Sequence, residues 1–299
     1  MFPIIPANSV AADSGNSEGI FGFGYDGSSV ISMTNLVSNA GVVSSDVTGV
    51  GTGGEGRGAT EYGGDKGIFG YGTGGSMSYT NLVSNTGVVS SDVTGVGTGR
   101  YYVSACGYGE DKGIFGFGSG YTSVTNLVSN TGVVSSDVAG VATSKYNLAA
   151  CEYGGDKGIF GYGKSTGTLH SITNLVSNTG VMASNTTGVG SARDALAACG
   201  YGEDKGIFGY GATATRVSMT NLVSNTGVVS SDVAGVGTAR NSVAACEYDG
   251  DKGIFGFGTD NTPVKVSITN LVSNTGVVAT DQAATTGQIR YALAACSFN

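Results

Sequence analysis

Basic residues recur at one fixed spacing along this 299-residue chain. Each stands six residues before a cysteine, and the five members are Arg100, Lys145, Arg193, Arg240 and Arg290. Guanidinium and ammonium groups bind carboxylate, sulfate or phosphate, and the arginine fork matches such oxyanions with two parallel hydrogen bonds. If the repeats that carry these residues close into a circle, they predict a ligand-binding basic ring at the mouth of a central channel.

Acidic residues upstream offer the same basic groups an internal partner. Asp92, Asp137 and Asp232 lie eight residues before Arg100, Lys145 and Arg240, and Asp281 lies nine residues before Arg290. An ion pair within one connection, or to the next repeat, would use up the charge, so structural pairing is the favoured interpretation and anion binding the alternative. One repeat breaks the pattern, because its Arg57 is shifted and Thr60 replaces the cysteine.

The repeats differ from one another mainly in two places. One is the stretch between the second and third predicted strands, and the other is the pair of residues after each basic residue. Both are predicted to emerge on one face, and loops on a rigid scaffold are where binding residues usually lie. We take Tyr101, Tyr146, His170 and Tyr291 as candidate ligand-binding residues of this variable face. Sequence drift at tolerant loops is the alternative explanation.

Residues for catalysis or metal binding are scarce. The chain has a single histidine, His170, and no Cys-x-x-Cys pair, whereas zinc sites need several such ligands. The acidic residues either recur in turns or stand alone. The sequence therefore predicts a protein that is not an enzyme and has no catalytic residues, metal or cofactor. A hydrolase or lyase with its site at the channel mouth remains as a further alternative.

Two repeated phrases indicate the architecture that must position these residues. Gly-Ile-Phe-Gly occurs six times, and Thr-Asn-Leu-Val-Ser-Asn recurs at steps of 46, 45, 48, 47 and 49 residues. A period of about 40–50 residues built from strands is typical of β-propeller blades. One unit divides into strands at 193–199, 207–211, 218–224 and 228–233. We therefore predict an all-β fold, a six-bladed β-propeller of four-stranded antiparallel blades that spans residues 18–299 as one domain.

The two ends of the chain compete for one position in the first blade. Residues 290–298 form a complete first strand with no continuation, while 9–12 resemble the same strand. We expect the C-terminal copy to pair with the strand at 19–24 and to close the circle, which leaves no open sheet edge. Residues 1–17 are then an N-terminal tail or an extra strand.

The order of features resembles the kelch branch of the β-propellers: a basic residue, a small-residue strand, a turn, and a strand that ends in glycines. The adjacent glycine pair of kelch repeats is Gly-Tyr-Gly or Gly-Phe-Gly here, and the later tryptophan is missing. The chain is also similar to repetitive propeller-like proteins from phage and viral genomes. Since kelch domains mostly bind other proteins, the resemblance implies a binding scaffold.

Composition narrows the partners. The net charge of −8 argues against nucleic acid and anionic membranes, and no apolar run reaches the ~18–20 residues of a membrane helix. The five cysteines at repeat spacing predict small buried side chains rather than disulfides, which leaves the compartment open with a slight preference for the cell interior. We expect a non-catalytic scaffold whose variable face binds an unknown ligand, a glycan, an anion or a protein. A structural or engineered near-symmetric propeller with no ligand is the alternative.

Overall fold

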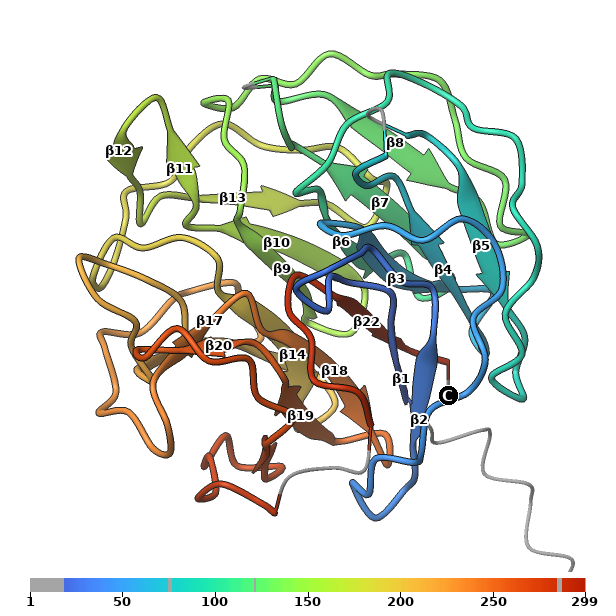
Figure 1. The fold of residues 1–299 in the computed structure, drawn as a ribbon. Coiled ribbons are helices and arrows are strands. Elements are labelled where there is room, and N and C mark those ends of the chain that lie inside the picture. Colours follow the sequence, from blue (N-terminus) through green and yellow to red (C-terminus); the bar gives the residue numbers. More distant parts are fainter. Residues whose placement is uncertain (1–18, 75–76, 121, 284–286, 299) are drawn as a thin grey trace, which may run out of the picture.

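The fold consists of strands and loops. The computed structural model describes residues 19–74, 77–120, 122–283 and 287–298, and every regular element within these ranges is a β-strand (Figure 1). The predicted tail or extra strand at 1–17 lies outside the described residues. No helix of a length and apolarity that could span a membrane occurs in the described ranges.

Each repeat forms a three-stranded antiparallel sheet with the Gly-Ile-Phe-Gly phrase on its middle strand. The middle strands are β1 (Gly19–Gly22), β4 (Lys66–Gly70), β7 (Lys112–Gly116), β10 (Lys157–Gly161), β15 (Lys205–Gly209) and β19 (Lys252–Gly256). On one side lie the small-residue strands β3 (Gly58–Tyr62), β6 (Ser104–Tyr108), β9 (Ala149–Tyr153), β14 (Ala197–Tyr201), β18 (Ala244–Tyr248) and β22 (Ala294–Ser297). On the other side lie β2 (Thr34–Val37), β5 (Thr80–Val83), β8 (Thr125–Val128), β13 (Thr173–Val176), β16 (Thr220–Val223) and β21 (Thr269–Val272).

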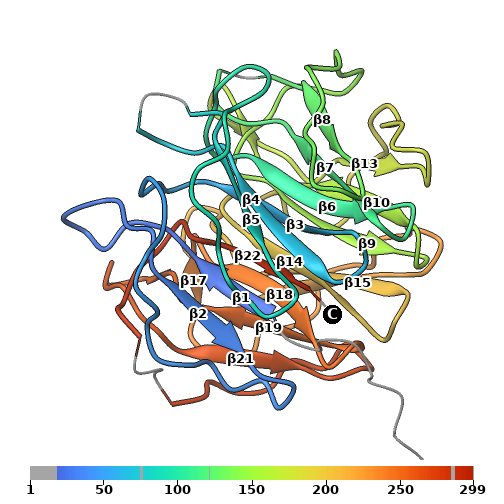
Figure 2. The same ribbon diagram turned by 90° about the vertical axis from the view of Figure 1, so that its right-hand side faces the viewer.

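The small-residue strands follow one another in a closed order. Contacts run from β3 through β6, β9, β14 and β18 to β22, and β22 in turn contacts β3. Figure 2 shows these strands gathered near the middle of the molecule. As predicted, the C-terminal strand joins the first sheet: β22 pairs with β1, with Cys296 opposite Ile20, so the two ends of the described chain lie side by side (Figure 1).

The fourth strand of each repeat differs from the prediction. The run at 228–233 touches β16 only through isolated bridges, at Val229 and Val233, and equivalent runs behave in the same way. The Leu222 amide donates to Ser230 Oγ at 2.9 Å instead of to a backbone carbonyl. Because a side-chain oxygen takes the place of a carbonyl, the backbone ladder is interrupted, and each sheet has three regular strands.

The two glycines of Gly-Ile-Phe-Gly explain why the phrase is repeated. A Cβ on Gly206 would lie 2.5 Å from Cys151 Sγ of the preceding sheet, and one on Gly209 would lie 2.7 Å from the ring of Phe255 in the next sheet. Such distances allow no side chain at either position. The phrase therefore specifies close packing of a sheet against both of its neighbours.

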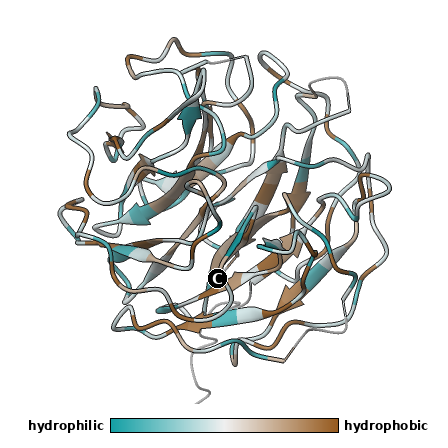
Figure 3. Ribbon diagram, turned by 60° about the vertical axis from the view of Figure 1, so that its left-hand side comes forward, coloured by the Kyte–Doolittle hydropathy of each residue, from teal (hydrophilic) through white to brown (hydrophobic). Residues whose placement is uncertain are grey.

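The apolar core lies between neighbouring sheets. In one such layer, Cys151 and Ile159 of one sheet pack with Phe208 and Val223 of the next. The brown colour of Figure 3 follows these strands, while hydrophilic residues lie mainly toward strand ends and loops. All five cysteines are free and buried, so the prediction of small buried side chains is confirmed.

Two additional two-stranded pairs involve the variable loops. β11 (Lys164–Ser165) pairs with β12 (Thr168–Leu169) inside one loop between the second and third strands of a repeat. β17 (Arg240–Asn241) pairs with β20 (Thr259–Asp260), which joins the residues after a basic position to a variable loop. The two variable zones predicted from sequence are therefore in contact in this part of the molecule.

Candidate functional site

The five predicted ring residues are buried between sheets. Arg100 is 1% exposed and Lys145, Arg193, Arg240 and Arg290 are 0% exposed. This arrangement corrects the predicted placement at the channel mouth. A ligand in solvent does not reach these charges in this structure, and the reason is that each of them satisfies groups inside the fold.

Arg193 shows how the charge is used. Its guanidinium donates to Tyr210 O at 2.9 Å, to Ser191 O at 3.2 Å and to Asn221 Oδ1 at 2.8 Å. Its Cζ lies 4.3 Å from the ring centre of Tyr162 in the preceding sheet, a cation–π contact. The side chain therefore joins two strands of its own sheet to the neighbouring sheet.

The acidic partners differ from those predicted: Asp232 was expected to pair with Arg240, yet Arg240 Nη1 lies 3.6 Å from Asp281 Oδ1. Arg193 Nη1 lies 4.0 Å from Asp232 Oδ1, a residue 39 positions downstream. The same carboxylate accepts hydrogen bonds from the amide and hydroxyl of Ser191, at 3.0–3.1 Å and 2.7 Å. Burial opposes ionisation of Asp232, but these bonds, the amide of Asn221 and the Arg193 charge outweigh it and lower the pKa of Asp232. The ion pair thus links connections that are far apart in sequence.

The junction between the last and first repeats has the same contacts. Arg290 donates to Phe23 O at 2.9 Å and to Asn35 Oδ1 at 2.7 Å, and the Gln288 amide donates to Asp46 at 2.9 Å. These bonds join residues 242 to 267 positions apart. Closure therefore uses the chemistry of the internal junctions.

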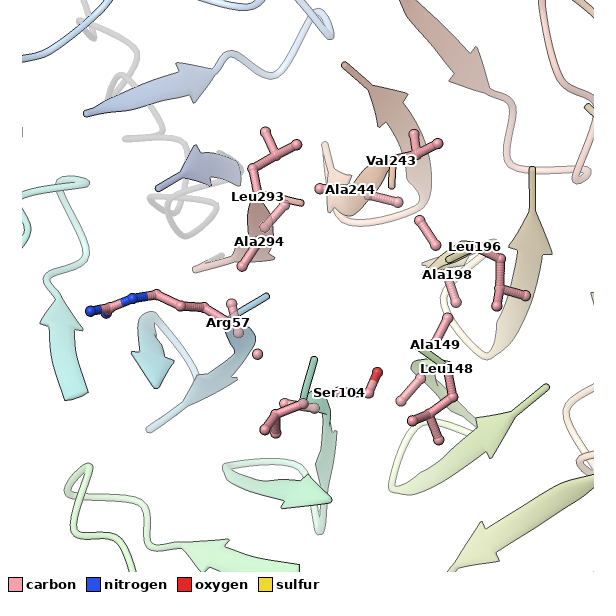
Figure 4. A pocket seen from close by; sticks show the side chains of 18 residues that line it. Arg57, Ser104, Leu148, Ala149, Leu196, Ala198, Val243, Ala244, Leu293 and Ala294 are labelled. Atoms are coloured by element: carbon pink, nitrogen blue, oxygen red, sulfur yellow. The ribbon is translucent and has the colours of Figure 1, made fainter. Parts of the chain in front are cut away.

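Arg57, which the sequence analysis left out of the ring, is the sixth member. It starts from a position three residues closer to the inner strand, yet its Nη1 donates to Asn81 Oδ1 at 2.7 Å and its Cζ lies 3.9 Å from the Phe23 ring centre. In Figure 4 its side chain extends away from the channel centre. The phrase Thr-Asn-Leu-Val, whose asparagine receives this bond in every repeat, was the available signal.

The junction at Lys145 is the exception in this set. Lys145 Nζ donates to Asn174 Oδ1 at 3.2 Å, and Asn185 stands where the other repeats have an aspartate. Burial without a carboxylate partner lowers the pKa of Lys145 to about 7. This junction therefore holds a cation that can lose its proton near neutral pH.

A channel runs between the small-residue strands of all six sheets. Figure 4 shows its wall, with Ala149, Ala198, Ala244 and Ala294 directed around an open centre. At one end the wall is formed by residues that all have positive φ. Five stand two positions after a basic residue and Gly56 precedes Arg57: Gly56, Tyr102, Asn147, Ala195, Ser242 and Ala292. Their amides and carbonyls bond to one another, for example Ser242 N to Ala195 O at 2.8 Å. This end is therefore a narrow ring of hydrogen-bonded backbone groups, which we call the backbone girdle.

The opposite end of the channel contains three carboxyl groups. Glu61, Glu152 and Glu247 lie there, on alternate sheets, and the sheets between them have Gly107, Gly200 and Ser297 at the same place. Burial, reinforced by the charge of Glu61, raises the pKa of Glu247 to about 8. Glu61 and Glu152 share a hydrogen bond, and burial raises the pKa of both. The described residues form no cluster of metal-ligand type, so we assign no ion to this end.

Tyr101 and Tyr146, two of the four predicted face residues, meet in one cavity. They line a cavity of about 260 Å³ with Tyr102, Ser119 and Gly120. The ring of Tyr102 lies 4.8 Å from that of Tyr101 and 6.2 Å from that of Tyr146. The structure thus brings these two predicted residues together around a third tyrosine.

Tyr291 belongs to a second cavity, and His170 has a different role. The second cavity, of about 370 Å³, is lined by Tyr25, Gly27, Arg216, Asn241, Ser242, Thr259, Pro263, Lys265 and Tyr291. The rings of Tyr25 and Tyr291 are 5.6 Å apart and almost perpendicular. His170 bonds instead to Ser165 Oγ at 2.6 Å, and burial and the Lys145 charge lower its pKa. Tyr25, Arg216 and Lys265 were not predicted as site residues, although all three stand in the variable loops.

Comparisons with known proteins add no family. No protein-family model matches the chain, and no curated protein matches it.

Proposed function

We propose that the protein is a six-bladed β-propeller that acts as a non-catalytic binding scaffold. Three facts support the propeller: the six repeated sheets, the closed order of their small-residue strands, and a junction between Arg290 and Asn35 that repeats the internal ones. In this arrangement the irregular fourth run is the outer edge of each blade. The resemblance to kelch repeats supports the same architecture at the level of motif order.

The variable face is the binding face in this proposal. The observation that carries it is the position of two tyrosine-lined cavities in the loops that vary among otherwise near-identical repeats. Tyr102 and Ser242 belong both to these cavities and to the backbone girdle, so the cavities lie beside the channel mouth. Rigid aromatic walls with a few polar groups are typical of small-ligand sites.

A saccharide is the ligand class that these cavities fit best. Tyrosine combines a broad apolar ring with a hydroxyl, which suits the apolar face and polar rim of a sugar ring. The tyrosine rings are set edge to face or stacked at 4.8–6.2 Å, so their faces are held in place before a ligand arrives. Several such sites on one face would gain affinity by multivalency.

Binding to a panel of immobilised oligosaccharides tests the proposal. We expect Tyr101→Ala and Tyr291→Ala each to weaken binding by about threefold to tenfold, since an aromatic contact contributes about 0.5–1.5 kcal/mol. Tyr79→Ala is the matched control, because Tyr79 is an exposed tyrosine outside both cavities. A panel on which the wild-type protein binds no saccharide would reject a saccharide ligand and favour a scaffold without one.

A further inference from the structure

The basic residues of this acidic protein are distributed unevenly between structural and surface roles. Of its 14 lysines and arginines, six stand at the buried junctions and five in the constant turns, where each pairs with an aspartate. The three others are Lys164, Arg216 and Lys265. All three lie in the variable loops, and two of them line one cavity, the 370 Å³ cavity with Tyr25 and Tyr291.

Arg216 and Lys265, the two cationic residues of this cavity, have N–H groups left to donate to a ligand. Arg216 uses its Nε on Asn241 Oδ1 at 2.9 Å, which fixes the plane of the guanidinium and leaves its two terminal nitrogens. The amide of Arg216 is bonded to Asn261 Oδ1 at 3.0 Å, so the backbone is held as well. A guanidinium anchored in this way is arranged to receive the two oxygens of a carboxylate or sulfate.

Lys265 comes from the neighbouring loop and is positioned by a glycine. A Cβ on Gly27 would collide with Lys265 Nζ, and Gly27 has φ of +99°, so the ammonium lies over a backbone bend that needs glycine. Within the described residues no carboxylate lies within ion-pair distance of Lys265 or Arg216. The cavity therefore carries two positive charges from two loops on a molecule of net charge −8.

The two carboxylates of these loops are engaged in their own turns. Asp260 accepts hydrogen bonds from the amides of Thr262 and Val264 at 2.8 and 2.9 Å. Asp26 accepts from Ser28 and Ser29, and its second oxygen accepts from Gln288. Each carboxylate shapes its loop, and the hydrogen bonds from Thr262 and Val264, with a smaller contribution from the Arg216 charge, lower the pKa of Asp260.

We propose that this cavity is an acidic-saccharide site, in which Arg216 and Lys265 bind the carboxylate or sulfate of a sugar whose ring lies against Tyr25 and Tyr291. The inference rests on the proposed function and narrows it to anionic ligands at one cavity. The neighbouring 260 Å³ cavity has tyrosines and no basic residue in its wall, so it serves as the neutral counterpart.

Titration calorimetry of the full chain tests the assignment with three probes: a galacturonate trisaccharide, a galactose trisaccharide and galactose 6-sulfate. We expect the galacturonate ligand to bind more tightly than the galactose ligand, and more weakly as salt is raised. Arg216→Gln/Lys265→Gln is expected to weaken galacturonate binding by about tenfold or more, where tenfold corresponds to about 1.4 kcal/mol. Binding of the galactose ligand should not change. Preference between galacturonate and galactose 6-sulfate identifies the anionic group.

Lys164→Gln is the matched control, since it removes one positive charge from the same face but outside this cavity. Thermal unfolding of each variant checks that the fold is intact. Equal binding of charged and neutral sugars, or equal losses in Lys164→Gln and the double variant, would overturn the acidic-saccharide site while the binding scaffold stands. Binding of no probe, together with tyrosine variants that behave like wild type on the oligosaccharide panel, would overturn both.

Discussion

The junctions at Arg193 and Lys145 occupy equivalent places between neighbouring sheets, yet they bury a cation in different ways. Arg193 has Asp232 within 4.0 Å, whereas Asn185 stands in the acidic place beside Lys145. Both cations donate to the asparagine of Thr-Asn-Leu-Val, so the hydrogen-bond frame is shared. The two junctions therefore differ in the cation, an arginine or a lysine, and in the presence of a carboxylate.

The comparison indicates that the two positions change together: a buried arginine occurs with an aspartate, and the buried lysine occurs with an asparagine. An arginine cannot lose its proton at physiological pH, so its burial needs a counter-charge. A lysine can, and the pKa of Lys145 is lowered to about 7 where the acid is missing. Loss of the aspartate is thus compensated by a side chain that can become neutral.

Removal of a paired cation is expected to have the largest effect. Arg193→Ala leaves Tyr210 O, Ser191 O and Asn221 Oδ1 without their donor and Asp232 without its counter-charge. Each buried acceptor left without a donor costs about 1–3 kcal/mol, so we expect a loss of about 3–5 kcal/mol in the free energy of unfolding. Urea denaturation followed by circular dichroism measures it.

Two further substitutions show whether this loss is specific. Arg216→Ala removes an arginine from the surface and should change the free energy of unfolding by less than about 0.5 kcal/mol. Arg290→Ala removes the cation at the closing junction and should cost as much as Arg193→Ala, because its contacts are the same. A clearly smaller cost at Arg290 would argue that the ends of the chain separate independently of the other sheets.

Glu247 is a buried acid without a cationic partner, which is the reverse of Lys145, a buried cation without an acidic partner. The pKa of Glu247 is raised to about 8, so the folded state binds its proton more tightly than the unfolded chain does. The contribution of Glu247 to the free energy of unfolding is fully present below its unfolded pKa of about 4.3 and is lost as pH rises through about 8. Glu247→Gln should therefore be more stable than wild type at pH 6 by about 2 kcal/mol, since this pH lies about 1.7 units above the unfolded pKa and each unit corresponds to about 1.4 kcal/mol.

The comparison of pH values provides the control for Glu247→Gln. At pH 4.5 the wild-type carboxyl is protonated in the folded state, so the variant and the wild type should unfold at nearly the same urea concentration. A variant whose advantage is equal at both pH values would show that packing against Gly200, rather than charge, is responsible.

The repeated parts of the fold were predictable because their geometry is local. The period, the small-residue strand and the C-terminal closing strand all follow from phrases that recur at one spacing, and β22 pairs with β1 as expected. The fourth strand was not predictable from its apolar residues, because Ser230 Oγ replaces a backbone acceptor in its pairing.

The candidate site was predicted less completely, because it depends on contacts between distant loops. Tyr101 and Tyr146 were predicted as residues of one variable face and line one cavity, but Arg216 and Lys265 meet only where two loops come together in space. Structural pairing of the basic ring was favoured, yet spacing indicated the wrong acids: Asp232, expected to pair with Arg240, lies 4.0 Å from Arg193, 39 residues before it. Position in the closed arrangement, rather than distance along the chain, decides these contacts.

Restoring the missing acid is the smallest and most direct change to the comparison. The pKa of Lys145 is lower in the folded state than in the unfolded chain, about 7 against about 10.5. Between these pH values the unfolded chain takes up a proton that the folded state does not. The contribution of Lys145 to stability is therefore fully present above pH of about 10.5 and is lost as pH falls toward about 7. Asn185→Asp should keep Lys145 charged in the folded state and raise the free energy of unfolding at pH 7 by about 1 kcal/mol, the scale of a favourable ion pair. The gain should fade toward pH 10, as measured by urea denaturation at both pH values.

The double variant Lys145→Met/Asn185→Asp is the control for this prediction. Its added carboxylate has no cation and should destabilise the fold. If the double variant gains as much stability as Asn185→Asp alone, the pairing of cation and acid is not what distinguishes the two junctions.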